Sequence, residues 1–179
     1  MKPLLQPVAP SIDDPLELLR ACHDKVRRFA TLALKLRSHL DGLVHPVSGE
    51  HHVDAQAQEA AQSILRYFEM AAPLHHEDED LNLFPALRAL GQSRLTQAID
   101  SLEAEHHSLG HLWQAVTPWL RAVAAGQVHA PPDELATFAH RYVAHAQREE
   151  DEVYPAADQL SAQTLTEISA AMVARRTRA

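Results

Sequence analysis

The sequence contains a single cysteine, only five glycines and few aromatic residues in its 179 positions. One cysteine cannot form a disulfide bond within the chain, so Cys22 excludes an internally cross-linked fold and agrees with a reducing compartment. Alanine and leucine are plentiful instead, and both residues favour helices. This composition predicts an all-α protein rather than a protein built on β-sheets.

Long apolar runs are also missing from the sequence. None of them approaches the roughly 20 residues that a helix needs to span a bilayer. The first residues, MKPLLQP, lack the long apolar stretch and the small-residue cleavage site of a signal peptide. We therefore expect a cytoplasmic protein that does not associate with membranes.

The chain contains fewer basic than acidic residues. It has 16 lysines and arginines against 24 aspartates and glutamates, which gives a net charge of −8. Binding to the phosphates of nucleic acids needs a basic face, so we expect no nucleic-acid partner. Arg175, Arg176 and Arg178 form a small basic cluster. Its simplest explanation is a set of cations at the C-terminal end of the last helix.

Apolar residues recur at helical spacing along most of the chain, and the periodic stretches are separated by glycine and proline. Asp13 or Asp14 can cap the first helix, with Pro15 in its first turn. Pro73 falls inside the second helical stretch and should kink or interrupt it. The predicted helices cover about 14–42, 53–90, 95–125, 133–160 and 161–179.

Four long helices joined by short connections predict an antiparallel four-helix bundle, with the short fifth helix packed outside it. Residues 1–13 contain three prolines and little periodicity, and we expect them to form an N-terminal arm. Residues 14–160 should form the bundle, and residues 161–179 the extra C-terminal helix. Nothing in the sequence resembles a linker to a second domain.

A gapless internal repeat carries the clearest chemical signal in the chain. Residues 75–87 read HHEDEDLNLFPAL, and residues 145–157 read HAQREEDEVYPAA. Each copy contains His-x3-Glu, then five residues and then proline, and the last two of the five are an apolar residue and an aromatic residue. Histidine is abundant, with 13 in the chain, so about one His-x3-Glu is expected by chance. The repetition therefore makes the motif specific.

The spacing of the repeated residues is suited to metal binding. Residues four positions apart lie on one face of a helix, with Cβ atoms about 5–6 Å apart. His75 with Glu79, and His145 with Glu149, can therefore reach one metal centre, or each carboxylate can bridge two metals. Two such helices facing each other would provide two imidazoles and two carboxylates, which suit Fe, Mn or Zn.

We expect two further imidazoles from the first and third helices. His23 lies on the apolar face of the first helix. On the third helix, His106 is followed by apolar residues at the same offsets as His23, which favours it as a ligand. His107 and His111 form an i,i+4 pair and are an alternative, because at most one of these two faces can point into the bundle.

Taken together, these residues resemble the hemerythrin-like family, also called HHE cation-binding domains, over about residues 14–160. The resemblance implies an up-and-down four-helix bundle that holds two iron ions, joined by an oxo or hydroxo bridge. Manganese and zinc are possible substitutes for iron. The carboxylates of the repeat would bridge the two ions. The implied ligands are His23, His75, Glu79, His106, His145 and Glu149.

The resemblance leaves two points of ligation open. Oxygen-carrying hemerythrins use five histidines, two of them at i,i+4 on the third helix. His107 and His111 would restore that set, whereas His106 alone gives a four-histidine site. On the fourth helix, Glu150 stands at the i+5 spacing that some hemerythrins use, although the repeat favours Glu149.

Several charged residues near the motifs can orient the histidines through hydrogen bonds to their outer ring nitrogens, as is common for metal-bound imidazoles. The charged candidates for this role are Glu77, Asp78, Asp80, Glu105 and Asp151. We expect most of them to lie on solvated helix faces instead.

The resemblance also implies a function. We expect a protein that binds or senses O2, NO or peroxide, or that handles iron, as a monomer or homodimer. The alternative is a di-iron enzyme of iron–sulfur cluster repair or of defence against nitrosative or oxidative stress. The sequence itself identifies no pocket for an organic substrate and no second cofactor.

Overall fold

The computed structural model describes residues 14–43 and 50–177. The predicted N-terminal arm at residues 1–13 and Arg178 lie outside the described residues. Every regular element between these bounds is helical, which confirms the all-α class. No helix in the described part of the chain is both long and apolar enough to cross a membrane.

The long elements are α1 (Pro15–Gly42), α2 (Ala55–Arg66), α5 (Ser93–Ala124), α6 (Glu134–Arg148) and α7 (Ala162–Arg176). Two short helices continue the direction of α2, namely α3 (Ala72–Asp78) and α4 (Phe84–Arg88). Wider π-helical turns separate these pieces, namely η1 (Tyr67–Ala71) and η2 (Glu79–Leu83). Beyond α6 the chain continues in a π-helical turn and a 3-10 helix, namely η3 (Glu149–Val153) and η4 (Tyr154–Gln159).

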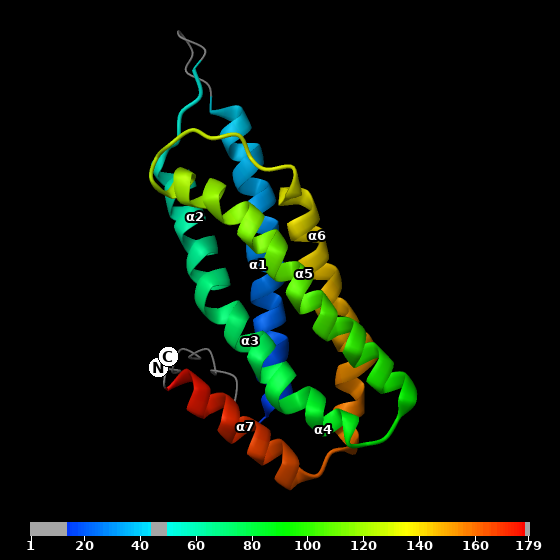
Figure 1. Cartoon of the computed structure of the whole chain (residues 1–179). Helices are drawn as coiled ribbons and strands as arrows, with labels where there is room; N and C mark the ends of the chain where they lie inside the picture. The colour runs from blue at the N-terminus through cyan, green and yellow to red at the C-terminus, as the bar shows by residue number, and fades with distance from the viewer. Residues whose placement is uncertain (1–13, 44–49, 178–179) are drawn as a thin grey trace, which may run out of the picture.

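The chain rises along α1, descends through α2, α3 and α4, rises again along α5 and descends along α6 (Figure 1). Helix α1 packs against α2 and α6, and α5 packs against the same two helices on its own side. Helix α7 lies across one end of this assembly, where it contacts α1, α3 and η2. Each long segment therefore faces two others across a common interior.

Polar side chains begin three of the helices, as expected for capping residues. Asp14 accepts hydrogen bonds from the backbone N–H groups at the start of α1, which confirms one of the two predicted caps. Asp54 caps α2 in the same way, and Ser161 caps α7. Gly91 and Gly126 follow α4 and α5 with φ angles of 70° and 76°, a conformation that glycine adopts without steric cost.

A proline follows each of the π-helical turns, although Pro118 lies within α5 without one. Pro73 follows η1, Pro85 follows η2 and Pro155 follows η3, each within two residues of the wide turn. Proline has no N–H to donate, and its ring clashes with the carbonyl four residues earlier. A π-turn relieves this conflict without ending the helix, so the predicted interruption at Pro73 is confirmed as a local widening.

Buried apolar side chains form two clusters, one in each half of the bundle. The first joins α1, α2, α5 and α6 and includes Phe68, Leu120 and Phe138. The second joins the start of α1 to α4, α5 and α7 and includes Leu19 and Phe84. Along each of the four long segments, buried polar residues lie between the two clusters.

A buried carboxylate fastens α7 to the bundle. Asp78 is fully buried and forms ion pairs with Arg175 and with Arg176, the latter at 2.5 Å. Arg175 also donates to Asn82 at 2.8 Å. Both arginines lie in the last turn of α7 as predicted, but their charge is directed at a buried acid as well as at the helix end.

Replacing Asp78 by alanine should lower the free energy of unfolding by about 3–5 kcal/mol, because breaking a buried ion pair leaves its partners uncompensated. Glu77→Ala is the matched control. Glu77 contacts the same Arg175 but is 53% exposed, so its loss should cost less than about 1 kcal/mol. Urea denaturation followed by circular dichroism measures both values. Equal losses would contradict a special role for the buried carboxylate.

Candidate metal centre

Six residues of the predicted ligand set meet in the polar layer between the two apolar clusters. They come from four separate segments of the bundle, and none is more than 7% exposed. Glu79 and Glu149 are the first residues of the π-turns η2 and η3, so the same local distortion follows each carboxylate. The six residues are His23, His75, Glu79, His106, His145 and Glu149.

Glu149 lies at the centre of the imidazoles. Its carboxylate oxygens are 3.0 Å from His23 Nε2, 2.9 Å from His145 Nε2 and 3.3 Å from His106 Nε2. Only the contact with His106 has the alignment of a hydrogen bond. Nitrogen atoms of three helices thus converge on one carboxylate, and those of His23 and His145 do so without hydrogen-bond alignment.

Glu79 lies in the same layer, with a ligand atom within 4.8 Å of one of Glu149. The Tyr154 hydroxyl donates a hydrogen bond of 2.6 Å to Glu79 Oε1 and lies 3.2 Å from His23 Nε2. The other oxygen, Oε2, lies 3.5 Å from His75 Nε2 and 3.6 Å from His106 Nε2. The tyrosine therefore fixes one carboxylate oxygen and leaves the second one facing two imidazoles.

Carboxylates outside the layer hold the outer nitrogens of three histidines. Glu150 lies 2.8 Å from His23 Nδ1. Asp80 lies 2.9 Å from His106 Nδ1, and Glu105 lies 3.0 Å from His145 Nδ1. In a neutral imidazole, such a contact places the proton on Nδ1 and leaves the Nε2 lone pair facing inward.

These contacts settle the roles of the predicted orienting residues. Asp80 and Glu105 orient histidines as predicted. The other three candidates do not orient a histidine, because Glu77 and Asp78 pair with α7 and Asp151 accepts from Gln147. Two of the orienting carboxylates also pair with arginines. Arg27 pairs with Glu150 at 2.6 Å, and Arg148 pairs with Glu105.

The two buried carboxylates have opposite electrostatic surroundings. Burial and the negative charge of Glu149 raise the pKa of Glu79 well above its usual value. Burial also acts to raise the pKa of Glu149, but the close imidazoles outweigh it and hold that pKa well below its usual value. Glu149 is therefore the ionised carboxylate of the pair, and Glu79 is the one that more readily takes up a proton.

The imidazoles respond to the same surroundings. Burial, followed by the nearby His23, lowers the pKa of His75 well below its usual value. Burial alone would lower the pKa of His106 too, but hydrogen bonds with Asp80 and Glu149 raise it to about 9. A buried neutral imidazole with an available lone pair is the form that binds metals.

Unsatisfied atoms inside the layer indicate what it can hold. Glu79 Oε2, Glu149 Oε2 and His145 Nε2 are buried and have no aligned hydrogen-bond partner among the described residues. Leaving such an atom without a partner costs about 1–3 kcal/mol, and more for a charged group. Metal cations would satisfy all three atoms, and imidazole with carboxylate is a donor set that Fe, Mn and Zn accept. The residues therefore fit a metal centre.

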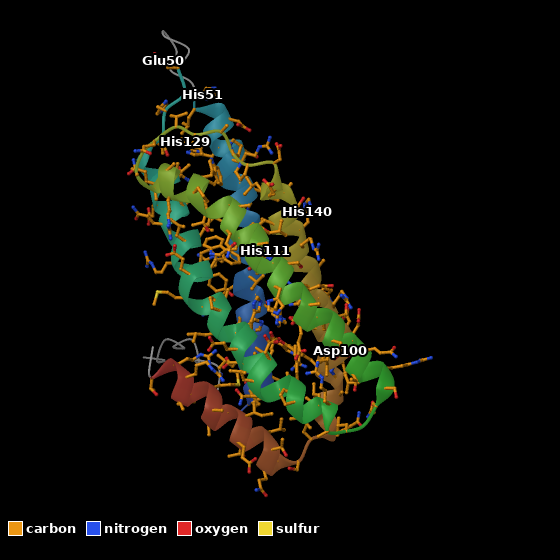
Figure 2. The ribbon with its side chains drawn as sticks, in the orientation of Figure 1. Glu50, His51, Asp100, His111, His129 and His140 are labelled. Carbon is orange, nitrogen blue, oxygen red and sulfur yellow. The ribbon has the colours of Figure 1, made fainter. Side chains whose placement is uncertain are left out.

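The remaining predicted residues do not reach the layer. His107 and His111 are exposed on α5, and Figure 2 shows His111 among the outer side chains of that helix. Glu150 contacts the outer nitrogen of His23 rather than the inner one. Figure 2 also places the exposed His51 and His129 at the end of the bundle opposite α7, far from the layer.

Sequence reasoning missed two residues of the site. Tyr154 aligns with Phe84 in the repeat and differs from it only by the hydroxyl that bonds to Glu79. His76 follows His75 directly, and its ring stacks on that of His106 with centroids 4.0 Å apart. The His-His pair at the start of the first repeat was the only signal for His76.

Known proteins resemble this chain along most of its length. The family model described as "Hemerythrin HHE cation binding domain" matches residues 14–157, which include the whole polar layer. A Haemophilus influenzae protein, described only as "Uncharacterized protein", is 34% identical over 165 residues. That match covers 92% of this chain and 91% of the relative.

Neutral replacements of the two glutamates should change the stability of the metal-free protein in opposite directions. Glu79→Gln should raise the free energy of unfolding at pH 7, because it removes a carboxyl whose folded-state pKa is raised by burial. Glu149→Gln should lower it. The depressed folded-state pKa of Glu149 adds stability above its usual value of 4.5, and this contribution is lost as the pH falls.

Urea denaturation of chelator-treated protein measures both changes, and repeating it at pH 4 provides the control. Near that pH the difference between Glu79→Gln and the parent should shrink, because Glu79 is then protonated in both states, whereas the Glu149→Gln difference should largely persist, because it is lost only as the pH falls through the depressed folded-state pKa. Shifts of the same sign at pH 7 would contradict the assignment of charge to Glu149.

Replacing His106 and His107 in turn tests which of the two neighbours faces the metal. His106→Ala should weaken metal binding about tenfold or more, because it removes an inward nitrogen. His107→Ala, at an exposed position one residue further along α5, should leave binding unchanged. Competition with a chromophoric chelator measures both affinities. Loss of binding in the His107 variant would show that the register of α5 is different.

Proposed function

The chain belongs to the hemerythrin HHE cation-binding domain family, and from that membership we propose that it is a non-haem di-iron protein. Membership implies that the chain binds a cation. The buried imidazole–carboxylate layer is the observation that carries the proposal, because a cation would satisfy the inward atoms that have no aligned hydrogen-bond partner among the described residues. We propose that the iron ions are held by His23, His75, Glu79, His106, His145 and Glu149.

We further propose that residues 14–160 form an up-and-down four-helix bundle with α7 as an extra helix across one end. In this arrangement each bundle segment contributes at least one inward donor. The two apolar clusters lie above and below the donors and limit access of water to them. The outer carboxylates keep three imidazoles in fixed orientations, and Tyr154 keeps Glu79 in place.

Bound iron would supply reversible redox chemistry and coordination of a small molecule. The natural ligands would be O2, NO or peroxide, because donors that are at most 7% exposed are reached more easily by a small molecule than by a large one. We propose a binding or sensing role, or a role in iron handling, in the cytoplasm. Tyr154 is the buried hydroxyl closest to the donors, and it holds its proton toward Glu79 Oε1.

Metal analysis and optical spectra test this function. After anaerobic loading with ferrous iron, the protein should hold about two irons per chain. Glu79 and Glu149 are the two carboxylates that would bridge the irons, as glutamates do in other di-iron helical bundles. Glu79→Ala and Glu149→Ala should each hold less than half that amount. Glu152→Ala is the matched control, because Glu152 lies in the same π-turn as Glu149 but is 43% exposed and pairs with Arg148.

The response to small molecules then separates the roles. A charge-transfer band that forms with O2 or NO and disappears when the gas is removed supports binding or sensing. Rapid turnover of peroxide or NO without a stable band supports the alternative, a di-iron enzyme of stress defence or iron–sulfur cluster repair. Full iron content in both glutamate variants would contradict the metal site itself.

A further inference from the structure

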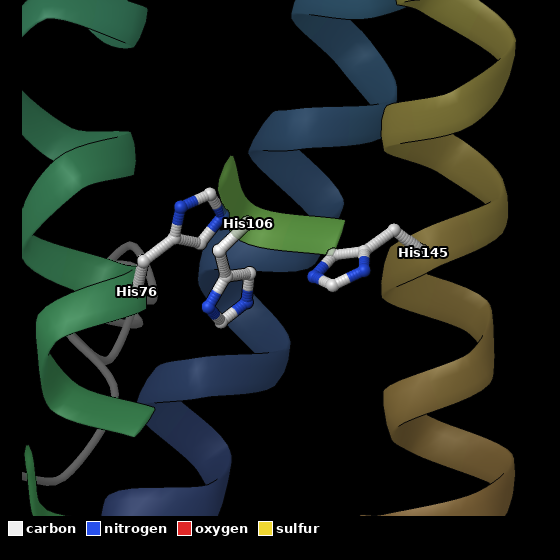
Figure 3. Close-up of side chains that lie close together, drawn as sticks. All are labelled: His76, His106 and His145. Atoms are coloured by element: carbon white, nitrogen blue, oxygen red, sulfur yellow. The ribbon is translucent and has the colours of Figure 1, made fainter. Parts of the chain in front are cut away.

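His76 is an additional imidazole beside the proposed metal centre. Figure 3 shows its ring reaching from α3 toward His106 of α5 and His145 of α6. Each of the three residues offers one ring nitrogen, and these nitrogens lie within 4.8 Å of one another. His76 has no hydrogen bond or ion pair with any other described residue, so its nitrogens are not committed elsewhere in that part of the chain.

Helix geometry explains how two consecutive histidines can both face the layer. Successive residues of an α-helix point about 100° apart. The ring of His75 meets that of His23 on α1, with centroids 4.7 Å apart. The ring of His76 meets that of His106 on α5, with centroids 4.0 Å apart. The inward direction of α3 therefore falls between the two side chains, and each faces a different neighbouring helix.

The ligand atoms divide into two groups. One group contains His23 and His75 with both carboxylates, and the other contains the three imidazoles of His76, His106 and His145. The carboxylates connect the groups, because each of them lies within 3.6 Å of at least one imidazole nitrogen from either group. With this division, each of two metals would have its own imidazoles, and both carboxylates would be within reach of the two metals.

We infer that His76 is a third imidazole ligand of the metal at His106 and His145. The two metals of the pair are then unequal, with two imidazoles on one metal and three on the other. The fifth imidazole comes from the segment that follows α2 and not from a second histidine on α5, where the residue four after His106 is Gly110. This inference rests on the proposed metal centre and adds a ligand to it.

A competing explanation is that His76 only supports the ring of His106 by stacking. The two rings are nearly parallel, with 11° between their planes. Replacing His76 by phenylalanine separates the two explanations, because phenylalanine keeps an aromatic ring for stacking and has no nitrogen to bind a metal. His107→Phe is the matched control at an exposed position on α5.

Proton NMR of the cobalt(II)-loaded protein in water counts the bound imidazoles, because each contributes one exchangeable N–H signal shifted far outside the normal range. We expect five such signals in the unchanged protein and in His107→Phe, and four in His76→Phe. Metal titration should show that His76→Phe binds one of its two metals about tenfold or more weakly, with the other metal unaffected.

Four shifted signals in the unchanged protein would overturn the inference, as would a His76→Phe variant that keeps its full signal count and both affinities. The count in the unchanged protein decides the question even if the variant fails to fold. Absence of any shifted signal, with no metal retained, would instead contradict the proposed metal centre. The two failures are therefore distinguishable.

Discussion

The burial of two carboxylates between two apolar clusters is the constraint on which the rest of this structure depends. Glu79 and Glu149 are fully buried, and an uncompensated buried charge is among the most expensive features a fold can contain. Histidines surround both residues, and a tyrosine bonds to one of them. Even so, three inward atoms keep no aligned partner among the described residues, and this unsatisfied set is what makes the interior receptive to cations.

The backbone is also distorted at the two buried glutamates. Each buried glutamate begins a π-turn, and a proline follows that turn in both copies of the repeat. Proline makes an ideal α-helix unfavourable at these points, and π-turns are frequently found at functional sites. Each copy of the repeat therefore provides both the histidine and glutamate ligand atoms and the π-turn in which the glutamate lies.

Charge is arranged in shells around the layer. Carboxylates hold the outer nitrogens of three histidines, and Arg27 and Arg148 bind two of those carboxylates. In a chain with a net charge of −8, these arginines stabilise acidic groups that would otherwise repel one another. Arg175 and Arg176 extend the same principle to Asp78 and so connect α7 to the segment that carries His75 and Glu79.

The sequence by itself determined the helices, the principal breaks between them and the repeated His-x3-Glu motifs, because these features depend on spacing along one segment. It also favoured His106 over His107, since the apolar residues that follow His106 mark the buried face of α5. Tertiary structure alone decided the partners. Tyr154 meets His23 across 131 positions, and Glu150 meets it across 127, so no local pattern could pair them. The place of His76 was decided in the same way, because the ring it meets belongs to another helix.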